Sequence, residues 1–375
     1  MATSVEKAIL GLIVVSLLVS AGNMVFLNML MGVPARMEAI EARLRSMEDK
    51  LLAGELFPGE TELYMKAKEE GALIVYTVWD VEHIVKLLAE FSKRYPGIST
   101  TYWQAKSAEI VAKVLTALEG GEKVVDVIIG MTPPVQLLGR GAIEPYKSVQ
   151  IDDLYYKNEK LVVAQVAPAV VAYNKDLLAP EDVPKTLEDL VNPKYMNRVC
   201  MGDPLAPGTP MAAFLAGLRE YWNNDTKWAN FIHRLKALNP VLYRSTSEME
   251  RLLAAGEYSL CIGTYLHEVV MDIKKGAPVG YTQIEPTVLI GGYAGIYLLA
   301  PHPNAAKLFA EWLVSVEGQL ILASLLRTPN RVGVPSEVSL ETLLPNVHLF
   351  IPEPEAYLAD MTKYMETQIK PVWES

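Results

Sequence analysis

Cysteine is nearly absent from this chain, and its scarcity excludes several kinds of site. The 375 residues contain two cysteines, Cys200 and Cys261. Two cysteines cannot form a disulfide-rich scaffold or a cysteine-rich zinc site. Both lie in expected strands, and neighbouring parallel strands rarely satisfy disulfide geometry, so we expect two buried, reduced thiols. Any chemistry must therefore rest on oxygen and nitrogen groups.

Basic residues are also few relative to acidic ones. Basic residues number 34 against 44 acidic ones, which gives a formal net charge of −10. The sequence has no block rich in Lys and Arg and no nucleic-acid-binding motif. Because basic side chains must neutralise the phosphates of a nucleic acid, we expect no nucleic-acid partner. The length favours two domains with additional segments.

Recognisable catalytic motifs are missing as well. The sequence contains no GxSxG, no HExxH and no Walker loop, and no other set that pairs a nucleophile with a base. We therefore expect that the protein is not an enzyme and has no resident cofactor.

The N-terminus contains a long uncharged segment. Residues 8–31 carry no charged side chain, and as a helix they are long enough to cross a hydrocarbon core of about 30 Å. A signal peptide cleaved after Ala21 is the alternative, but the apolar run continues beyond a usual signal-peptide core. No cysteine lies nearby to carry a lipid. We interpret residues 1–33 as an uncleaved transmembrane anchor.

A short helical stalk is expected next, over residues 34–60. Its apolar residues alternate steps of three and four, with charged residues between them. Two heptads fall below the three to four that a coiled coil normally needs. A solvated spacer helix and a coiled coil that forms a dimer both fit. The apolar seam consists of Met37, Ile40, Leu44, Met47 and Leu51.

Strands and helices alternate from Gly71 onward. Apolar segments at 72–78, 98–103 and 124–129 are expected as strands, and Asp80 and Ser107 as N-caps of the helices between them. This order indicates a parallel sheet, whose ligands bind at the carboxyl ends of the strands. The polar and aromatic candidates at these ends are Thr77, Trp79, Asp80, Ser107 and Thr132.

The same design repeats after an apolar crossing segment, 161–173. Expected strands at 197–202, 241–244 and 258–263 form a second sheet, and Tyr265 lies just past the last of them. Thr209 and Pro210 are expected at the N-cap and first position of a helix. The chain then returns toward the first lobe through 279–284 and 296–299.

A strand-to-helix junction at 294–319 completes the pattern. Pro301 and Pro303 break an apolar run, and Asn304 is placed as an N-cap. Apolar residues then recur at helical spacing up to Val316, and Gly318 is expected to close the helix.

Seven segments in this order resemble the ferric-iron-binding branch of type II periplasmic-binding-protein-like proteins, the extracellular solute-binding proteins of ABC importers. They are FSKRYPGI, VVDVIIG, GRGAIEPYKS, VVAYNKDLL, LEDLVNPKYMNRVCMGDPLAPGT, GEYSLCIGTY and APHPNAAKLFAEWLVSVEGQ. The resemblance covers about 71–335. It implies a two-lobed α/β fold with a crossing hinge, which closes on a solute and passes it to ABC permease and ATPase subunits.

The resemblance also implies how the chain is divided between the lobes. Lobe 1 comprises 71–166 together with about 287–340, which returns to it. Lobe 2 comprises 167–286, and about 341–375 is expected to pack on it. Because a solute-binding module works outside the cell, we expect an extracytoplasmic binding domain that the N-terminal helix holds at the cell membrane.

The ligands that ferric-binding relatives use are mostly lacking here. Such proteins offer two adjacent tyrosines, but Tyr265 is followed by Leu266. The loops at 77–80 and 130–132 lack the expected histidine and glutamate. We interpret the single histidines His83 and His267 as structural groups. No metal site is predicted; if ferric ion is the transported ligand, Tyr265 and Asp80 would bind it.

An anion pocket is the preferred interpretation. The loop before the Thr209 helix places backbone N–H groups at a helix N-terminus, which favours an anion, and related proteins use this loop for one. We predict a small anionic or anion-containing solute between the lobes; the alternatives are iron import and a membrane-tethered ligand sensor. Further candidates for binding it are Asp203, Gly208, Thr209, Tyr265 and Tyr293.

Overall fold

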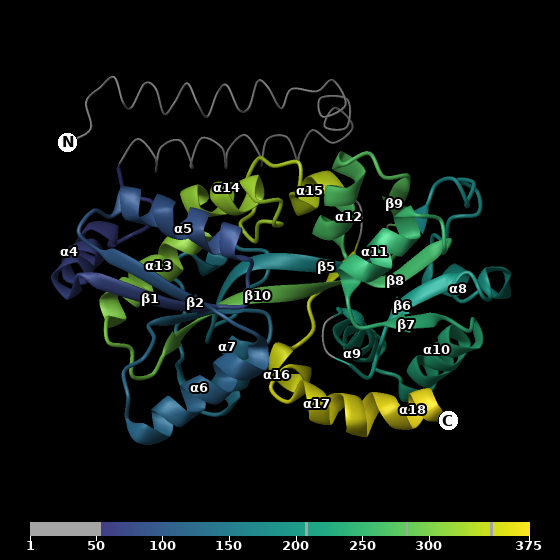
Figure 1. Cartoon of the computed structure of the whole chain (residues 1–375), viewed down its shortest axis with the longest axis horizontal. Helices are drawn as coiled ribbons and strands as arrows, with labels where there is room; N and C mark the ends of the chain where they lie inside the picture. Colours follow the sequence, from purple (N-terminus) through teal and green to yellow (C-terminus); the bar gives the residue numbers. More distant parts are fainter. Residues whose placement is uncertain (1–53, 207–208, 283, 346–347) are drawn as a thin grey trace.

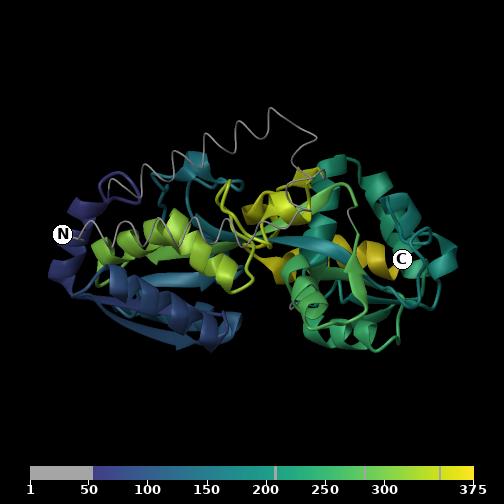
Figure 2. The same ribbon diagram turned by 90° about the horizontal axis from the view of Figure 1, so that it is seen from above.

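The computed structural model describes residues 54–206, 209–282, 284–345 and 348–375. They form two α/β lobes joined by long strands (Figure 1; Figure 2). The expected anchor and most of the expected stalk lie outside the described residues. Within those four ranges, no helix is both long and apolar enough to cross a membrane.

Lobe 1 contains the predicted parallel sheet. Strand β1 pairs with β2 on one side and with β3 on the other, all parallel. The helices follow the strands as the alternation predicts, although Lys106, not Ser107, is the N-cap of the second one. The elements are β1 (Ala72–Thr77), α5 (Val81–Arg94), β2 (Ser99–Gln104), α6 (Ser107–Gly120), β3 (Val127–Gly130), α7 (Pro133–Gly139) and β4 (Ile143–Glu144).

Two long antiparallel strands connect the lobes. They are β5 (Val162–Asn174) and β10 (Thr287–Tyr297), which pair with each other near the centre of the molecule (Figure 1). Strand β10 also pairs antiparallel with β3 of lobe 1, while β5 pairs antiparallel with β8 of lobe 2. The crossing hinge expected at 161–173 is therefore one half of a two-stranded connection.

Lobe 2 repeats the arrangement with a smaller sheet. Strand β6 pairs in parallel with β7 and with β8. The helices of this lobe are α8 (Leu187–Leu190), α9 (Met211–Trp222), α10 (Asp225–Ala237), α11 (Thr246–Ala254) and α12 (Leu266–Lys274). The strands are β6 (Val199–Gly202), β7 (Val241–Tyr243), β8 (Leu260–Tyr265) and β9 (Val279–Tyr281).

The return to lobe 1 differs from the prediction at both ends of its helix. Helix α13 (Pro303–Val314) has His302 as its N-cap, and the Asn304 backbone and side-chain N–H groups donate to the Glu70 carboxylate. Gly318 does not end the helix, because it lies inside the next one, α14 (Val316–Ser324). A Cβ at Gly318 would lie 2.1 Å from the Trp312 carbonyl oxygen, so the position requires glycine for close packing.

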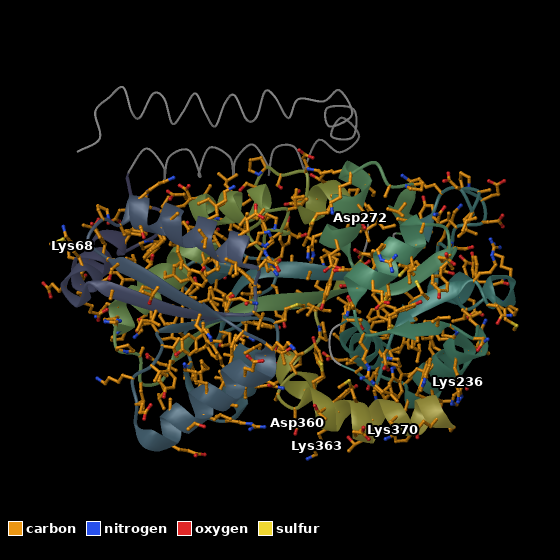
Figure 3. The ribbon with its side chains drawn as sticks, viewed as in Figure 1. Lys68, Lys236, Asp272, Asp360, Lys363 and Lys370 are labelled. Carbon is orange, nitrogen blue, oxygen red and sulfur yellow. The ribbon has the colours of Figure 1, made fainter. Side chains whose placement is uncertain are left out.

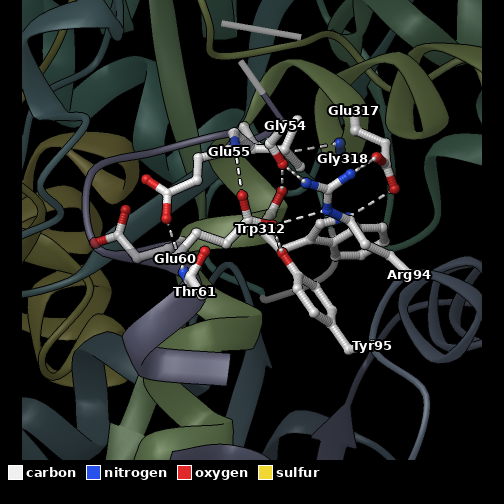
Figure 4. A network of polar contacts seen from close by, with 12 residues as sticks. Gly54, Glu55, Glu60, Thr61, Arg94, Tyr95, Trp312, Glu317 and Gly318 are labelled. Carbon is white, nitrogen blue, oxygen red and sulfur yellow. Dashed lines mark hydrogen bonds and ion pairs between the residues drawn. The ribbon is translucent and has the colours of Figure 1, made fainter. Parts of the chain in front are cut away.

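Helix α4 (Glu60–Glu70), which packs on α13, is fastened to lobe 1 by a buried carboxylate (Figure 4). Glu60 accepts hydrogen bonds from Arg94 Nε at 2.8 Å, from the Tyr95 hydroxyl at 2.6 Å and from the Leu56 backbone. Arg94 also contacts Glu317 at 3.1 Å. These contacts hold the described end of the expected stalk against the lobe.

The C-terminal segment contacts both lobes. Helix α16 packs on α7 of lobe 1, and α18 packs on α10 of lobe 2. Asp360, Lys363 and Lys370 lie along this segment in Figure 3. Its elements are α15 (Leu340–Leu343), β11 (Leu349–Phe350), α16 (Pro354–Tyr357), α17 (Met361–Tyr364), a π-helical turn (Met365–Ile369) and α18 (Lys370–Glu374).

Candidate functional site

Polar and aromatic side chains of lobe 1 and of strand β5 contact one arginine, Arg327, and two groups of lobe 2 lie within electrostatic range of it. The segment after α14 brings it there, since Gln165 of β5 forms a bridge with Pro329 and the Val166 N–H donates to the Thr328 carbonyl. We call the group the interlobe cluster. It consists of Trp79, Asp80, His83, Gln165, Tyr265, His267, Glu268 and Arg327.

The Arg327 side chain is buried and is held on three sides. Its Nε donates to His83 Nδ1 at 3.1 Å, and its Nη1 donates to Gln165 Oε1 at 3.2 Å. The guanidinium carbon lies 4.5 Å from the centre of the Trp79 ring, a distance suited to a cation–π contact. These contacts fix the position of the positive charge without neutralising it.

No carboxylate forms a hydrogen bond with Arg327 among the described residues. The nearest ion-pair atom is Asp80 Oδ2, 3.9 Å from Nη2, on a side chain that is 80% exposed. Burial lowers the pKa of Arg327 to about 10, and the more distant acids Asp80 and Glu268 only partly oppose this effect. A buried cation with a spare donor at Nη2 favours an anion beside it.

Trp79 provides a second spare donor in the same group. The indole is buried, and its Nε1 has no hydrogen-bond partner among the described residues. Its backbone N–H donates to the Thr77 hydroxyl at 3.0 Å, which fixes the turn at the end of β1. Thr77 itself is fully buried, so its hydroxyl holds the loop that presents Trp79.

Burial and the charge of Arg327 favour the neutral form of both histidines in the cluster. Burial, followed by the charge of Arg327, lowers the pKa of His83. The same causes lower the pKa of His267 to about 3. The Tyr265 ring lies 5.6 Å from that of His267, and burial raises the Tyr265 pKa, so the phenol keeps its proton. Arg327 is therefore the permanent cation of the cluster.

Glu268 forms a pair with a second buried carboxyl group, that of Glu250. Burial and the charge of Glu268 raise the pKa of Glu250 to about 9, and burial also raises that of Glu268. The Thr264 hydroxyl donates to Glu250. A proton held by Glu250 and shared with Glu268 would satisfy the Glu268 Oε2 atom, which otherwise lacks a partner among the described residues.

The predicted anion loop is only partly described. Gly208 lies outside the described residues. Helix α9 begins at Met211 with Pro210 as its N-cap, so the expected positions of Thr209 and Pro210 are wrong by one residue. Thr209 packs tightly on β6: a Cβ added at Gly202 would lie 2.3 Å from the Thr209 Oγ1.

Four other predicted residues lie outside the interlobe cluster, and two of them already have hydrogen-bond partners. Asp203 accepts from the Leu205 N–H at 2.9 Å, which shapes the turn after β6. The Tyr293 hydroxyl, fully buried in the core, lies 2.9 Å from the Tyr156 hydroxyl. Ser107 and Thr132 stand at helix starts without side-chain capping bonds. Of the predicted site residues, Trp79, Asp80 and Tyr265 belong to the interlobe cluster.

Asp80 takes the predicted N-cap position of α5 but not the capping bond. Its backbone carbonyl accepts from the N–H groups of His83 and Ile84, whereas its carboxylate makes no side-chain cap. That carboxylate faces Arg327 and His83, from which it lies 3.9 and 3.7 Å. Within the described ranges, no three His, Cys, Asp or Glu side chains are grouped to hold a metal ion.

Sequence reasoning missed Arg327 and Gln165. The signal for Arg327 was a single cation after the apolar run LASLL, where a buried helix ends. Gln165 was visible as a polar interruption of the crossing segment. A Cβ at Gly292 would lie 2.5 Å from the Gln165 side chain, so glycine on the paired strand makes room for it.

Comparison with known proteins shows which family the chain belongs to. The model of the bacterial extracellular solute-binding proteins matches residues 81–320. The chain belongs to this family. The match runs from α5 to α14, and so includes most of both sheets and the two connecting strands.

Three similar proteins illustrate the range of the family. An uncharacterised Haemophilus influenzae protein is 29% identical over 275 residues, 68% of this chain and 75% of its own. An Fe(3+)-binding periplasmic protein of Serratia marcescens is 21% identical over 80% of this chain and 90% of its own. AfuA of Actinobacillus pleuropneumoniae, solved with fructose-6-phosphate, has a TM-score of 0.61 and 21% identity over 81% of this chain and 97% of its own.

Proposed function

We propose that this solute-binding protein captures a small anionic solute between its lobes and delivers it to an ABC permease. Arg327 takes the negative group, with Trp79 Nε1 as a second donor and Tyr265 on the lobe 2 side. Solute binding to groups from both lobes would favour a closed arrangement of the lobes.

The observation that carries this proposal is the uncompensated charge of Arg327. A buried guanidinium normally has hydrogen-bonded carboxylates, because removal of a charge from water costs several kcal/mol. Arg327 instead has two neutral partners and one exposed acid at 3.9 Å. A bound anion would supply the missing hydrogen bonds and charge.

Iron is the second candidate, because a ferric-binding relative covers most of the chain. Tyr265 and Asp80 lie in the cluster and would supply the oxygen ligands that a hard cation prefers. The buried positive charge of Arg327 would repel a free ferric ion. Iron bound as an anionic chelate, such as ferric citrate, would meet Arg327 favourably.

A thermal-shift and calorimetric screen tests the proposal on the full chain in detergent. The probes are inorganic phosphate, fructose 6-phosphate, citrate, ferric citrate and ferric ion. We expect at least one anion to raise the melting temperature, since a ligand that binds the folded state stabilises it. The Arg327→Gln variant should lose that response, while Arg140→Gln, at an exposed arginine of lobe 1, should keep it. A response kept in Arg327→Gln would overturn the proposal.

A ferric response has its own signature. Binding of ferric ion alone, with a visible tyrosinate band that disappears in Tyr265→Phe, would establish the iron alternative and contradict the anion proposal. If none of the anions shifts the wild-type protein, the assignment of an anion to Arg327 is also contradicted.

We also propose that residues 8–31 hold the protein at the cell membrane with the lobes outside. The support is the length of the uncharged segment, which exceeds a signal-peptide core. Carbonate washing of membranes should leave the protein in the pellet. A shortened soluble form that begins near Gly22 would show cleavage and refute the anchor.

A further inference from the structure

The two cysteines of the chain face each other inside the lobe 2 sheet. Cys200 lies on β6 and Cys261 on β8, and the parallel register pairs these two residues directly. Both side chains are fully buried. No other cysteine occurs in the sequence, so neither thiol has an alternative partner within the chain.

Their separation is shorter than a relaxed contact between two thiols. The Sγ atoms lie 2.9 Å apart, whereas nonbonded carbon atoms, which are smaller than sulfur, settle at roughly 3.5–4.0 Å. A disulfide requires about 2.04 Å between the sulfurs, with Cα atoms roughly 4.4–6.8 Å apart. Neighbouring strands, spaced about 4.8 Å apart, provide that Cα separation.

We propose that Cys200 and Cys261 form a disulfide bond in the exported protein. The structure holds them as free thiols, and the sequence alone predicted that they stay reduced. The register changes that expectation, because the residues are direct partners and not merely on neighbouring strands. The family is extracellular, and disulfides form and persist in such oxidising compartments.

Oxidation of the pair requires an electron acceptor, which we assign to an oxidised dithiol protein of that compartment. One cysteine thiolate attacks the acceptor disulfide and forms a mixed disulfide, releasing one acceptor thiolate. The second cysteine thiolate then attacks the mixed disulfide. The Sγ–Sγ bond forms, the chain loses two hydrogens, and the acceptor leaves as a dithiol.

The exchange should take place before lobe 2 is fully folded. Both sulfurs are inaccessible in the folded sheet, and burial raises the pKa of Cys261 well above its usual value, which leaves little thiolate. Once formed, the bond would close a loop that contains α9, α10, β7 and α11. It would also link two strands that end beside Asp203 and at Tyr265, and so fix their spacing.

Thiol counting on the full exported chain tests the proposal. The protein is extracted from membranes, denatured and treated with N-ethylmaleimide before and after reduction, and its intact mass is measured. We expect no adduct before reduction and two adducts after it. Two adducts before reduction, or a disulfide-linked dimer on a non-reducing gel, would overturn the proposal. The measurement needs no variant, so a folding defect cannot obscure it.

A melting experiment provides an independent measurement. Wild-type protein that is reduced in denaturant and refolded with reductant should melt roughly 5–10 °C below the untreated protein, because loss of a disulfide releases conformational freedom in the unfolded chain. The Cys200→Ala/Cys261→Ala variant should melt at one temperature with or without reductant. An unchanged wild-type melting temperature would count against the bond. Neither measurement depends on the solute.

Discussion

Two arginines of this protein, the half-buried Arg94 and the buried Arg327, have opposite surroundings. Arg94 contacts two carboxylates, Glu60 at 2.8 Å and Glu317 at 3.1 Å, and donates to the Gly54 carbonyl (Figure 4). Arg327 has a histidine, an amide and an aromatic ring, and the nearest carboxylate atom, on the exposed Asp80, lies 3.9 Å away. The hydrogen bond to Glu60 and the nearby carboxylates raise the pKa of Arg94, whereas burial lowers that of Arg327 to about 10.

Under the proposed function, the difference separates a structural cation from one that binds the solute. Two carboxylates of the chain balance the charge of Arg94, so this ion-pair group stabilises the fold and needs no ligand. The charge of Arg327 is balanced only by the exposed Asp80 carboxylate at 3.9 Å, which should cost stability in the absence of the proposed anion. A buried arginine therefore indicates a binding site only when its carboxylate partners are missing.

The largest expected effect is a loss of stability when Arg94 loses one of its carboxylate partners. Glu60→Ala leaves the Arg94 charge with one carboxylate fewer and the Tyr95 hydroxyl without its acceptor. Loss of one partner of a fully buried ion pair typically costs about 3–5 kcal/mol. Because the Arg94 side chain is 24% exposed and keeps Glu317, we expect about 2–3 kcal/mol here. Urea unfolding should show a loss of this size. Glu62→Ala, at an exposed glutamate on the same helix, should leave the urea midpoint almost unchanged, because surface ion pairs contribute little to stability.

The second effect, at Arg327, should be a loss of binding with little loss of stability. Arg327→Met keeps much of the side-chain volume and removes a buried, poorly paired charge, so we expect the free energy of unfolding without solute to change by less than about 1 kcal/mol or to rise. Binding of an anion identified in the screen should weaken at least about 100-fold, as measured by calorimetry. A loss of stability similar to that of Glu60→Ala would make Arg327 a structural residue.

A third effect concerns pH and the acid pair beside the cluster. The Glu250 pKa rises from 4.5 to about 9 on folding. The protonated group therefore supports the folded state fully below about pH 4.5, and this contribution is lost as pH rises through 9. Glu250→Gln should be more stable than wild type at pH 9 by about 1–3 kcal/mol, with a smaller difference at pH 5. Thermal melts at both pH values measure the difference, and equal shifts would contradict the shared proton.

The smallest effect is expected at His267. Its pKa falls from 6.5 to about 3 on folding, so the unfolded chain takes up a proton first as pH decreases. This difference lowers stability as pH falls from about 6.5 toward 3. In thermal melts over that range, His267→Gln should lose less stability than wild type, whereas His233→Gln, at an exposed histidine of α10, should follow wild type. A parallel loss in both variants would show that His267 titrates normally.

The sequence predicted the two-lobed fold well, because apolar periodicity and turn residues act locally. Strands β1, β6 and β7 lie close to the expected limits at each end. Helix starts were predicted less well: at Asn304 the side chain binds Glu70, 234 residues away, in place of a cap. Gly318 looked like a helix end because the close approach of the Trp312 carbonyl cannot be read from local sequence.

The candidate site was harder to predict for the same reason. The expectation for Trp79, Asp80 and Tyr265 followed from strand ends, which parallel sheets place at one edge. Arg327 follows a helix and reaches the cluster through contacts of 328–329 with β5, so no motif marks it. Its missing carboxylate partner is a property of the folded chain.

The C-terminal segment has a consequence for motion. Solute capture in a two-lobed protein is usually pictured as rotation about the strands that join the lobes, here β5 and β10. In this chain α16 is attached to lobe 1 and α18 to lobe 2, and Lys160 binds Glu355 beside the start of β5 at 2.7 Å. Rotation of the lobes about these strands would therefore also have to move the residues between α16 and α18, which would limit how far the lobes can separate.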